Sequence, residues 1–257
     1  GEGANMSGEA QSRVDISLPD AQLALAEAVA ATGKPTAVLL RHGRALELEG
    51  AVKAAPAILC TWFLGSETGN AVADLVFGDH APQGRLPVSF PQASGQEPFY
   101  YNRRVTGRPQ LTDDKNYKTR YREVTNDALY PFGHGLTYGQ VSYGETKVGA
   151  AKLAWSATQT VTATVTNSGA RPAHEVVQLY IHDKVASITQ PMRALKGFQH
   201  VELQPGETKT VSFTLTRADL LIIGEDLKWQ AEPGQFDVWI APSAATGKGA
   251  TFELLKA

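Results

Sequence analysis

The sequence predicts an α/β half followed by an all-β half that folds as an antiparallel sandwich. Up to about residue 90, short apolar runs alternate with longer segments that repeat at helical spacing. Beyond about residue 141, apolar and polar residues alternate strictly within segments that turn-forming residues separate. The 257 residues, 42% of them hydrophobic, are enough for one large or two modest domains.

The first half begins with a predicted helix that starts at Leu18-Pro19 and stops at Gly33. Apolar runs at residues 36–40 and 57–60 have the length of strands, and a second helix is predicted between Glu67 and Phe77. Strands of this kind, separated by helices, favour a parallel sheet buried on both faces.

The middle of the chain, residues 91–140, has no clear periodicity and is rich in Tyr, Arg, Asn, Pro and Gly. Its aromatic residues argue against disorder, so we expect an ordered strap that connects the two halves. The four strongest strand predictions in the second half are residues 158–166, 175–181, 208–215 and 234–240.

Composition excludes several classes of function. Net charge is −2, from 24 basic and 26 acidic side chains without a long run of one sign, so we expect no nucleic-acid partner. No apolar run approaches the ~18 residues of a membrane span. Cys60 is the only cysteine, so no disulfide can form within the chain. The chain opens without an initiator Met or a signal peptide, and we expect a processed or truncated start.

The six histidines do not indicate a metal site, because none stands three or four residues from another, as a helical zinc site requires. They are His42, His80, His134, His174, His182 and His200. We expect neither a metal nor a cofactor.

The opening residues 1–13 form a polar, Gly-rich loop that carries two carboxylates, Glu2 and Glu9, and the guanidinium of Arg13. A loop carboxylic acid can serve as a general acid if burial raises its pKa. Arg13 could hydrogen-bond a sugar hydroxyl or hold the loop in place. The alternative is a solvated loop with surface charges, and composition alone favours it.

Several motifs occur in one order along the chain. They are MSGEAQSR (6–13), GKP (33–35) with LRHGRAL (40–46), WFLGSETGNAVADLVFGD (62–79), GRLPVSFP (84–91), LYPFGHGLTY (129–138), and PMRALKGF (191–198) with LQPGET (203–208). Together they resemble family 3 glycoside hydrolases, and most closely the C-terminal part of bacterial periplasmic-type β-glucosidases.

The resemblance implies a partial α/β sandwich domain at residues 1–90, a strap at 91–140 and a fibronectin type III-like domain at 141–257. The first sheet would then lack its earliest strands and expose an edge or meet a partner chain. The resemblance also implies a periplasmic or secreted enzyme, with a β-linked glucoside as substrate and no membrane or nucleic-acid partner. A homodimer is a further expectation.

Members of the family hydrolyse terminal β-linked glucose with retention, which needs two carboxyl groups about 5–5.5 Å apart. The resemblance implies that Glu9 is the acid/base, with Glu2 as the alternative because some members place this residue in an upstream GEG. Ser7 and Arg13 are the expected substrate-binding residues, and Ser12 replaces an Asp that is usual in the family. The nucleophilic Asp belongs to an N-terminal barrel outside this chain, so we expect the chain alone to be inactive.

The main alternative is a non-catalytic carbohydrate-binding or interaction module. Trp155, Trp229 and Trp239 could stack on a glycan, although core packing is the expected role of each. The preferred sugar and its linkage stay open at this point.

Overall fold

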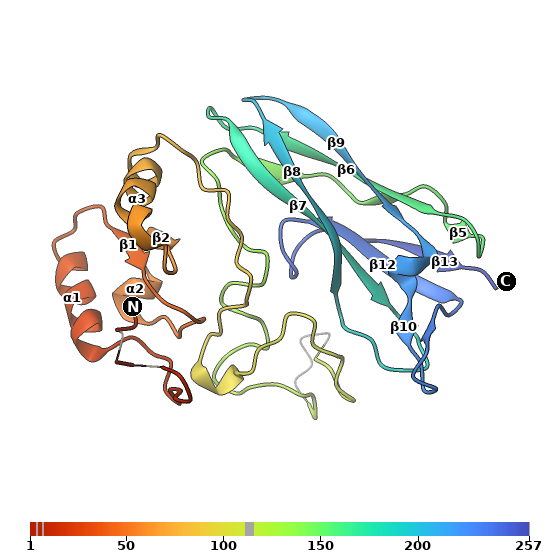
Figure 1. The fold of residues 1–257 in the computed structure, drawn as a ribbon, viewed down its shortest axis with the longest axis horizontal. Coiled ribbons are helices and arrows are strands. Elements are labelled where there is room, and N and C mark those ends of the chain that lie inside the picture. The colour runs from red at the N-terminus through yellow and green to blue at the C-terminus, as the bar shows by residue number, and fades with distance from the viewer. Residues whose placement is uncertain (4, 7, 111–115, 257) are drawn as a thin grey trace. The chain divides into compact units, whose positions relative to one another are not determined.

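The structure is a computed structural model that describes residues 1–3, 5–6, 8–110 and 116–256 (Figure 1). It divides into two compact units. Unit 1 comprises Gly1–His80, Val88–Phe99 and Tyr121–Tyr130, and unit 2 comprises Ala81–Pro87, Tyr100–Arg120 and Pro131–Ala257. The strap therefore contributes residues to both units.

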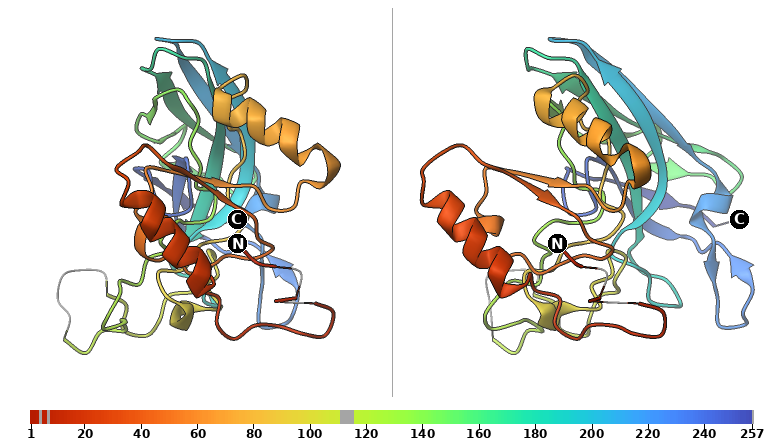
Figure 2. Two further views of the ribbon diagram at one scale, coloured as in Figure 1. Left: turned by 90° about the vertical axis from the view of Figure 1, so that its left-hand side faces the viewer. Right: turned by 60° about the vertical axis from the view of Figure 1, so that its left-hand side comes forward.

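Unit 1 has α/β character, as the sequence predicts. Its elements are α1 (Asp20–Ala30), β1 (Ala37–Leu40), α2 (Gly50–Lys53), β2 (Ala57–Cys60), η1 (Gly65–Glu67), α3 (Thr68–Phe77) and η2 (Ser94–Gln96). β1 and β2 pair in parallel, in a register that runs from Ala37 opposite Ala57 to Leu40 opposite Cys60. The helices α1 and α3 lie on opposite sides of this strand pair (Figure 2).

A glycine in the left-handed region caps α3, and another lies just beyond the end of α1. Gly33 has φ +68° and Gly78 has φ +86°, in the left-handed region that residues with a Cβ avoid. The N–H of Gly78 donates to the carbonyl of Asp74 at 3.1 Å, which satisfies one of the last carbonyls of α3.

The expectation of a sheet buried on both faces is wrong for this unit. Leu40 is buried, but Leu39 in the same strand is 43% exposed. Neither α1 nor α3 buries any residue. The physical reason is that α1 and α3 leave apolar residues such as Leu25 and Phe77 exposed and do not close over both faces of the two short strands.

Unit 2 is a β-sandwich. Its elements are β3 (Val141–Tyr143), β4 (Lys147–Val148), β5 (Lys152–Leu153), β6 (Gln159–Asn167), β7 (Ala173–Asp183), β8 (Ala194–Leu203), β9 (Thr208–Leu215), η3 (Arg217–Leu220), β10 (Ile222–Ile223), β11 (Trp229–Gln230), β12 (Gly234–Ala241) and β13 (Ala250–Leu254). One sheet has the order β5-β13-β12-β7-β8, and in the other β3, β4 and β9 all pair with β6. The four predicted strands are confirmed as β6, β7, β9 and β12.

The core of unit 2 lies between the two sheets. Along β6, buried residues alternate with less buried ones, and Val161 and Val165 are fully buried. Phe236 of β12 and Phe252 of β13 stack at 5.4 Å between ring centroids. Trp155 packs against this core as expected, whereas Trp229 is 67% exposed, so the expectation that it lies in the core is wrong.

A buried polar cluster joins the GRLP segment to the sandwich within unit 2. Arg85 forms an ion pair with Glu175 at 3.0 Å, and both side chains are about 95% buried, with exposed fractions of 6% and 5%. Tyr143 donates its hydroxyl proton to Glu175 at 2.9 Å, and burial raises the pKa of Tyr143. The ion pair gives Arg85 a structural role in the sandwich.

Nearby, Gly133 of the YPFGHG segment has φ +81°, and a Cβ there would lie 2.1 Å from Gln178 Oε1. Gln178 in turn donates to the carbonyls of Gly133 and Pro242, at 3.1 and 2.8 Å. These bonds fix the path of the chain where it enters the sandwich.

No helix among the described residues is long and apolar enough to cross a bilayer.

Candidate functional site

The opening segment of the chain lies in unit 1, beside the loops that follow β1. The N–H of Glu2 donates to the carbonyl of Arg41 at 3.1 Å, just beyond the carboxyl end of β1. In open α/β sheets, binding and catalytic groups gather outside the carboxyl ends of the strands. The local topology therefore brings residues 1–13 to the edge of the sheet where a site is expected.

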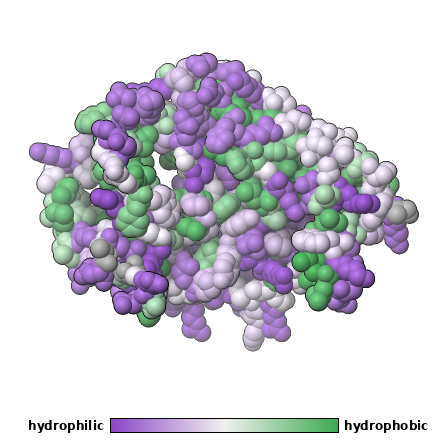
Figure 3. All heavy atoms as spheres, viewed as in Figure 1, coloured by the Kyte–Doolittle hydropathy of each residue, from purple (hydrophilic) through white to green (hydrophobic). Residues whose placement is uncertain are grey.

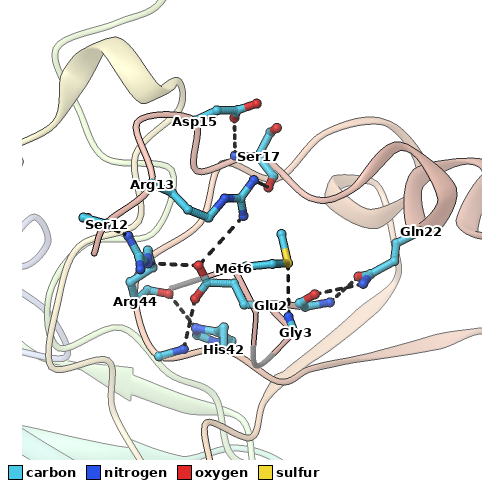
Figure 4. Close-up of polar contacts among 12 residues, drawn as sticks. Glu2, Gly3, Met6, Ser12, Arg13, Asp15, Ser17, Gln22, His42 and Arg44 are labelled. Atoms are coloured by element: carbon cyan, nitrogen blue, oxygen red, sulfur yellow. Dashed lines mark hydrogen bonds and ion pairs between the residues drawn. The ribbon is translucent and has the colours of Figure 1, made fainter. Parts of the chain in front are cut away.

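The carboxylate of Glu2 is buried among positive groups, as Figure 4 shows. Arg44 Nε lies 3.0 Å from Glu2 Oε1, and Arg13 Nη1 lies 3.8 Å from the same oxygen. The N–H of Gly43 reaches Glu2 Oε2 at 3.5 Å. The Glu2 side chain is only 5% exposed, so both of its oxygens are engaged inside the protein.

The two arginines also bind neighbouring backbone and side-chain oxygens. Arg13 Nη2 donates to the carbonyl of Ser17 at 3.4 Å, and Arg44 Nη1 donates to Ser12 Oγ at 3.4 Å. Asp15 accepts the N–H of Ser17 at 2.8 Å, which shapes the turn after Arg13. Arg13 and Arg44 thus tie the end of the opening loop to the loop after β1.

Glu9 lies at the tip of the opening loop. Gly8 and Gln11 exchange two backbone hydrogen bonds, of 3.4 and 3.1 Å, which close a tight turn around Glu9 and Ala10. Ala10 has φ +57°, which lies in the left-handed region. This conformation is energetically unfavourable for a residue that has a Cβ. Glu9 itself is exposed. Ser7, one of the predicted substrate-binding residues, lies outside the described residues.

His42 is fully buried beneath this cluster. Its Nδ1 lies 2.6 Å from the carbonyl of Arg44, so the ring donates from Nδ1 when neutral. The ring lies 4.4 Å from Trp62 and 5.5 Å from Phe90 between centroids. Burial lowers the pKa of His42, against the raising effects of the Arg44 carbonyl and the Glu2 charge.

The structure therefore brings two of the predicted site residues, Glu2 and Arg13, into contact and places Glu9 apart from them at the loop tip. Sequence reasoning missed Arg44 and His42 as members of the cluster. The LRHGRAL motif was the available signal, because it directly follows the first predicted strand. Within the described ranges, no group of three or more His, Cys, Asp or Glu side chains could hold a metal ion.

Comparison with known proteins agrees with the fold and with the motifs. The family described as Glycosyl hydrolase family 3 C-terminal domain matches residues 1–138, and the Fibronectin type III-like domain matches residues 175–244. The chain belongs to the glycosyl hydrolase family 3 C-terminal domain family.

Among curated relatives, a periplasmic beta-glucosidase of Salmonella typhimurium is 43% identical over 99% of this chain and 34% of its own length. A beta-xylosidase of Formosa agariphila is 41% identical over 92% of this chain and 32% of its own length. The chain thus spans about a third of the length of these relatives.

A solved structure is also similar throughout the chain. The beta-glucosidase of Listeria innocua in complex with glucose aligns with a TM-score of 0.91 and 37% identity, over 97% of this chain and 35% of that one. The similarity extends through both units of the chain described above.

Proposed function

We propose that this chain is the C-terminal region of a retaining β-glucosidase that removes terminal β-linked glucose from oligosaccharides and glycosides. In this proposal Glu9 is the acid/base, and the nucleophilic Asp lies in an N-terminal barrel of the same enzyme. Family membership and the beta-glucosidase relatives support the reaction class. The name of the Salmonella relative supports a periplasmic location.

The observation that carries the assignment of Glu9 is the contrast between the two candidate carboxylates. A general acid must reach the leaving-group oxygen within hydrogen-bond distance. Glu2 is enclosed by Arg13, Arg44 and Gly43, whereas Glu9 is exposed at the tip of a closed turn. Glu9 is therefore the carboxyl group that can meet a sugar held by another part of the protein.

The proposed reaction has two steps. Glu9 first donates a proton to the glycosidic oxygen while the Asp attacks the anomeric carbon, which expels the alcohol and leaves a glycosyl ester on the enzyme. Glu9, now a carboxylate, then takes a proton from the water that attacks the anomeric carbon. This cycle releases glucose with retained configuration and restores both carboxyl groups.

The exposed apolar residues of unit 1 support the proposal that another domain of the same enzyme covers this unit. Apolar side chains reach its surface near α1, β1 and α3 (Figure 3). These side chains are Leu25 (64% exposed), Val29 (38%), Leu39 (43%), Phe63 (64%), Leu64 (42%), Val76 (48%) and Phe77 (83%). Removing apolar surface of this extent from water is energetically favourable. We propose that the other two thirds of the enzyme cover part of it.

The test of the acid/base role uses the intact enzyme with Glu9→Gln. We compare kcat/KM for cellobiose with kcat/KM for 2,4-dinitrophenyl β-glucoside, whose leaving group departs without a proton. We expect a loss of about 100-fold or more on cellobiose and a much smaller loss on the activated glucoside. Near-normal hydrolysis of cellobiose by Glu9→Gln would remove Glu9 from the acid/base role.

A further inference from the structure

We propose that Glu2, Arg13 and Arg44 form a clamp that positions the loop carrying Glu9, and that Glu2 acts in the reaction only through Glu9. This inference rests on the proposed function, since it assigns Glu9 as the group that contacts the sugar. It makes Glu2 a positioning residue and gives the GEG of the opening segment a role distinct from proton transfer.

The clamp closes the loop at its two ends. Glu2 precedes the turn that carries Glu9 and Arg13 follows it in the sequence, and the side chains of Glu2 and Arg13 lie 3.8 Å apart. Arg44 comes from the loop after β1 and contacts both ends, since it pairs with Glu2 at 3.0 Å and donates to Ser12 at 3.4 Å. Glu9 lies between the two clamped ends, with its own tight turn between Gly8 and Gln11.

The clamp is also attached to the sheet. Its backbone anchor is the bond from the Glu2 N–H to the carbonyl of Arg41, the residue that follows β1. The buried ring of His42 donates to the carbonyl of Arg44 and packs on Trp62, which fixes the base of the Arg44 side chain. The position of the Glu9 loop is thereby set relative to the carboxyl ends of β1 and β2.

Burial strengthens the interactions among these three charged side chains. The exposed fractions are 5% for the Glu2 side chain, 18% for that of Arg13 and 27% for that of Arg44. Ion pairs this far from solvent are screened less than surface pairs, and removing one partner leaves the other charge without compensation. The loop therefore loses its fixed ends when the Glu2 charge is removed.

The expected consequence is specific to proton transfer. A misplacement of about 1 Å in a reacting group can lower a rate by about 100-fold. If the clamp positions Glu9, its loss should impair only the substrates whose leaving group needs a proton. A general loosening of the unit would lower kcat/KM for every substrate alike.

The experiment measures kcat/KM in the intact enzyme for Glu2→Gln, Arg44→Gln and the double variant. The substrates are cellobiose and 2,4-dinitrophenyl β-glucoside, and kcat/KM reports only the steps up to glycosyl transfer. Glu67→Gln is the matched control, because Glu67 is an exposed carboxylate of unit 1 that accepts only from Asn70 among the described contacts. Circular dichroism verifies that each variant is folded.

We expect Glu2→Gln to lose about 10- to 100-fold on cellobiose and less than about 3-fold on the activated glucoside. The double variant should lose no more than the larger single loss, because both substitutions open the same clamp. Glu2→Asp, which keeps the charge, should recover part of the activity on cellobiose. Glu67→Gln should leave both substrates unchanged.

Two results would overturn the clamp. One is an equal loss on both substrates, and the other is an unchanged kcat/KM for cellobiose in Glu2→Gln. Either can occur while Glu9→Gln still shows the leaving-group dependence of a general acid, so the clamp can fail while the acid/base assignment stands. If Glu9→Gln leaves kcat/KM unchanged on both substrates and Glu2→Gln shows the leaving-group dependence, both proposals fail and Glu2 is itself the acid.

Discussion

The two units of this chain differ in how completely they bury their apolar residues. Unit 2 encloses a continuous core between two sheets, with residues such as Val161, Phe236 and Phe252 at most 1% exposed. In unit 1 neither long helix buries a residue, and Phe77 is 83% exposed. The sandwich therefore supplies its own stability, whereas the unit with the candidate site combines buried charges with uncovered apolar surface.

The largest expected effect tests the closed core of unit 2. Phe236→Ala should destabilise the sandwich by about 3–5 kcal/mol, because it removes a stacked ring and leaves a cavity. The matched change in unit 1, Leu25→Ala on an exposed face of α1, should cost less than about 0.5 kcal/mol. Urea unfolding of both variants measures the difference, and equal losses would contradict the contrast between the units.

A second prediction concerns the buried ion pair of unit 2. Glu175→Gln should cost about 3 kcal/mol, because Arg85 then lies buried without a compensating charge. The exposed pair between Lys248 and Glu145 is the control, and Glu145→Gln should cost less than about 1 kcal/mol. A stability of Glu175→Gln equal to that of the control variant would show that the pair is not buried in solution.

A third prediction concerns pH and unit 1. Burial lowers the pKa of His42 below its ordinary value of 6.5, so the unfolded chain binds this proton more readily than the folded one. The stabilising contribution is complete above pH 6.5 and is lost as pH falls from 6.5 through the lowered pKa. Thermal melts at pH 7.5 and 5 should show this decrease.

The variant His42→Phe isolates that effect. It should reduce the drop in melting temperature between pH 7.5 and 5. His134 of unit 2 titrates in the same direction, since burial lowers its pKa as well, and its contribution should persist in the variant. An identical pH dependence in His42→Phe and the parent would contradict the burial of His42.

The smallest expected effect concerns Cys60, at the end of β2. Burial raises the pKa of its thiol to about 11, so little thiolate is present at pH 8. Ellman's reagent should react with Cys60 much more slowly in the folded chain than in urea. Rapid reaction in the folded chain would mean that the end of β2 is open to solvent.

The sequence predicted the fold well where a local pattern sets the structure. Strict alternation predicted β6, β7, β9 and β12, and the spacing of apolar residues predicted α1 and α3. It missed β8 because Ala194–Leu203 mixes charged residues and glycine into exposed and half-exposed positions, and it missed β13 because Ala250–Leu254 is only five residues long. Both segments become strands by pairing with the preceding strands β7 and β12, and this pairing is a tertiary contact that the local pattern does not report.

The candidate site could be predicted only in part, for a similar reason. Motif resemblance pointed to Glu9, Glu2 and Arg13, all within one short segment. The contact between Glu2 and Arg44 joins residues 42 positions apart along the chain, and no spacing rule reports it. The distinction between an enclosed carboxylate and an exposed one likewise exists only in three dimensions.

The measurement that tests the account most directly is azide rescue of the intact enzyme. Azide attacks a glycosyl ester without help from a base, so an enzyme that lacks only its acid/base forms a β-glucosyl azide from 2,4-dinitrophenyl β-glucoside. We predict this product and faster turnover with azide for Glu9→Gln, and a weaker effect of the same kind for Glu2→Gln, in which Glu9 is present but misplaced. Glucosyl azide from Glu2→Gln, with none from Glu9→Gln, would contradict the account.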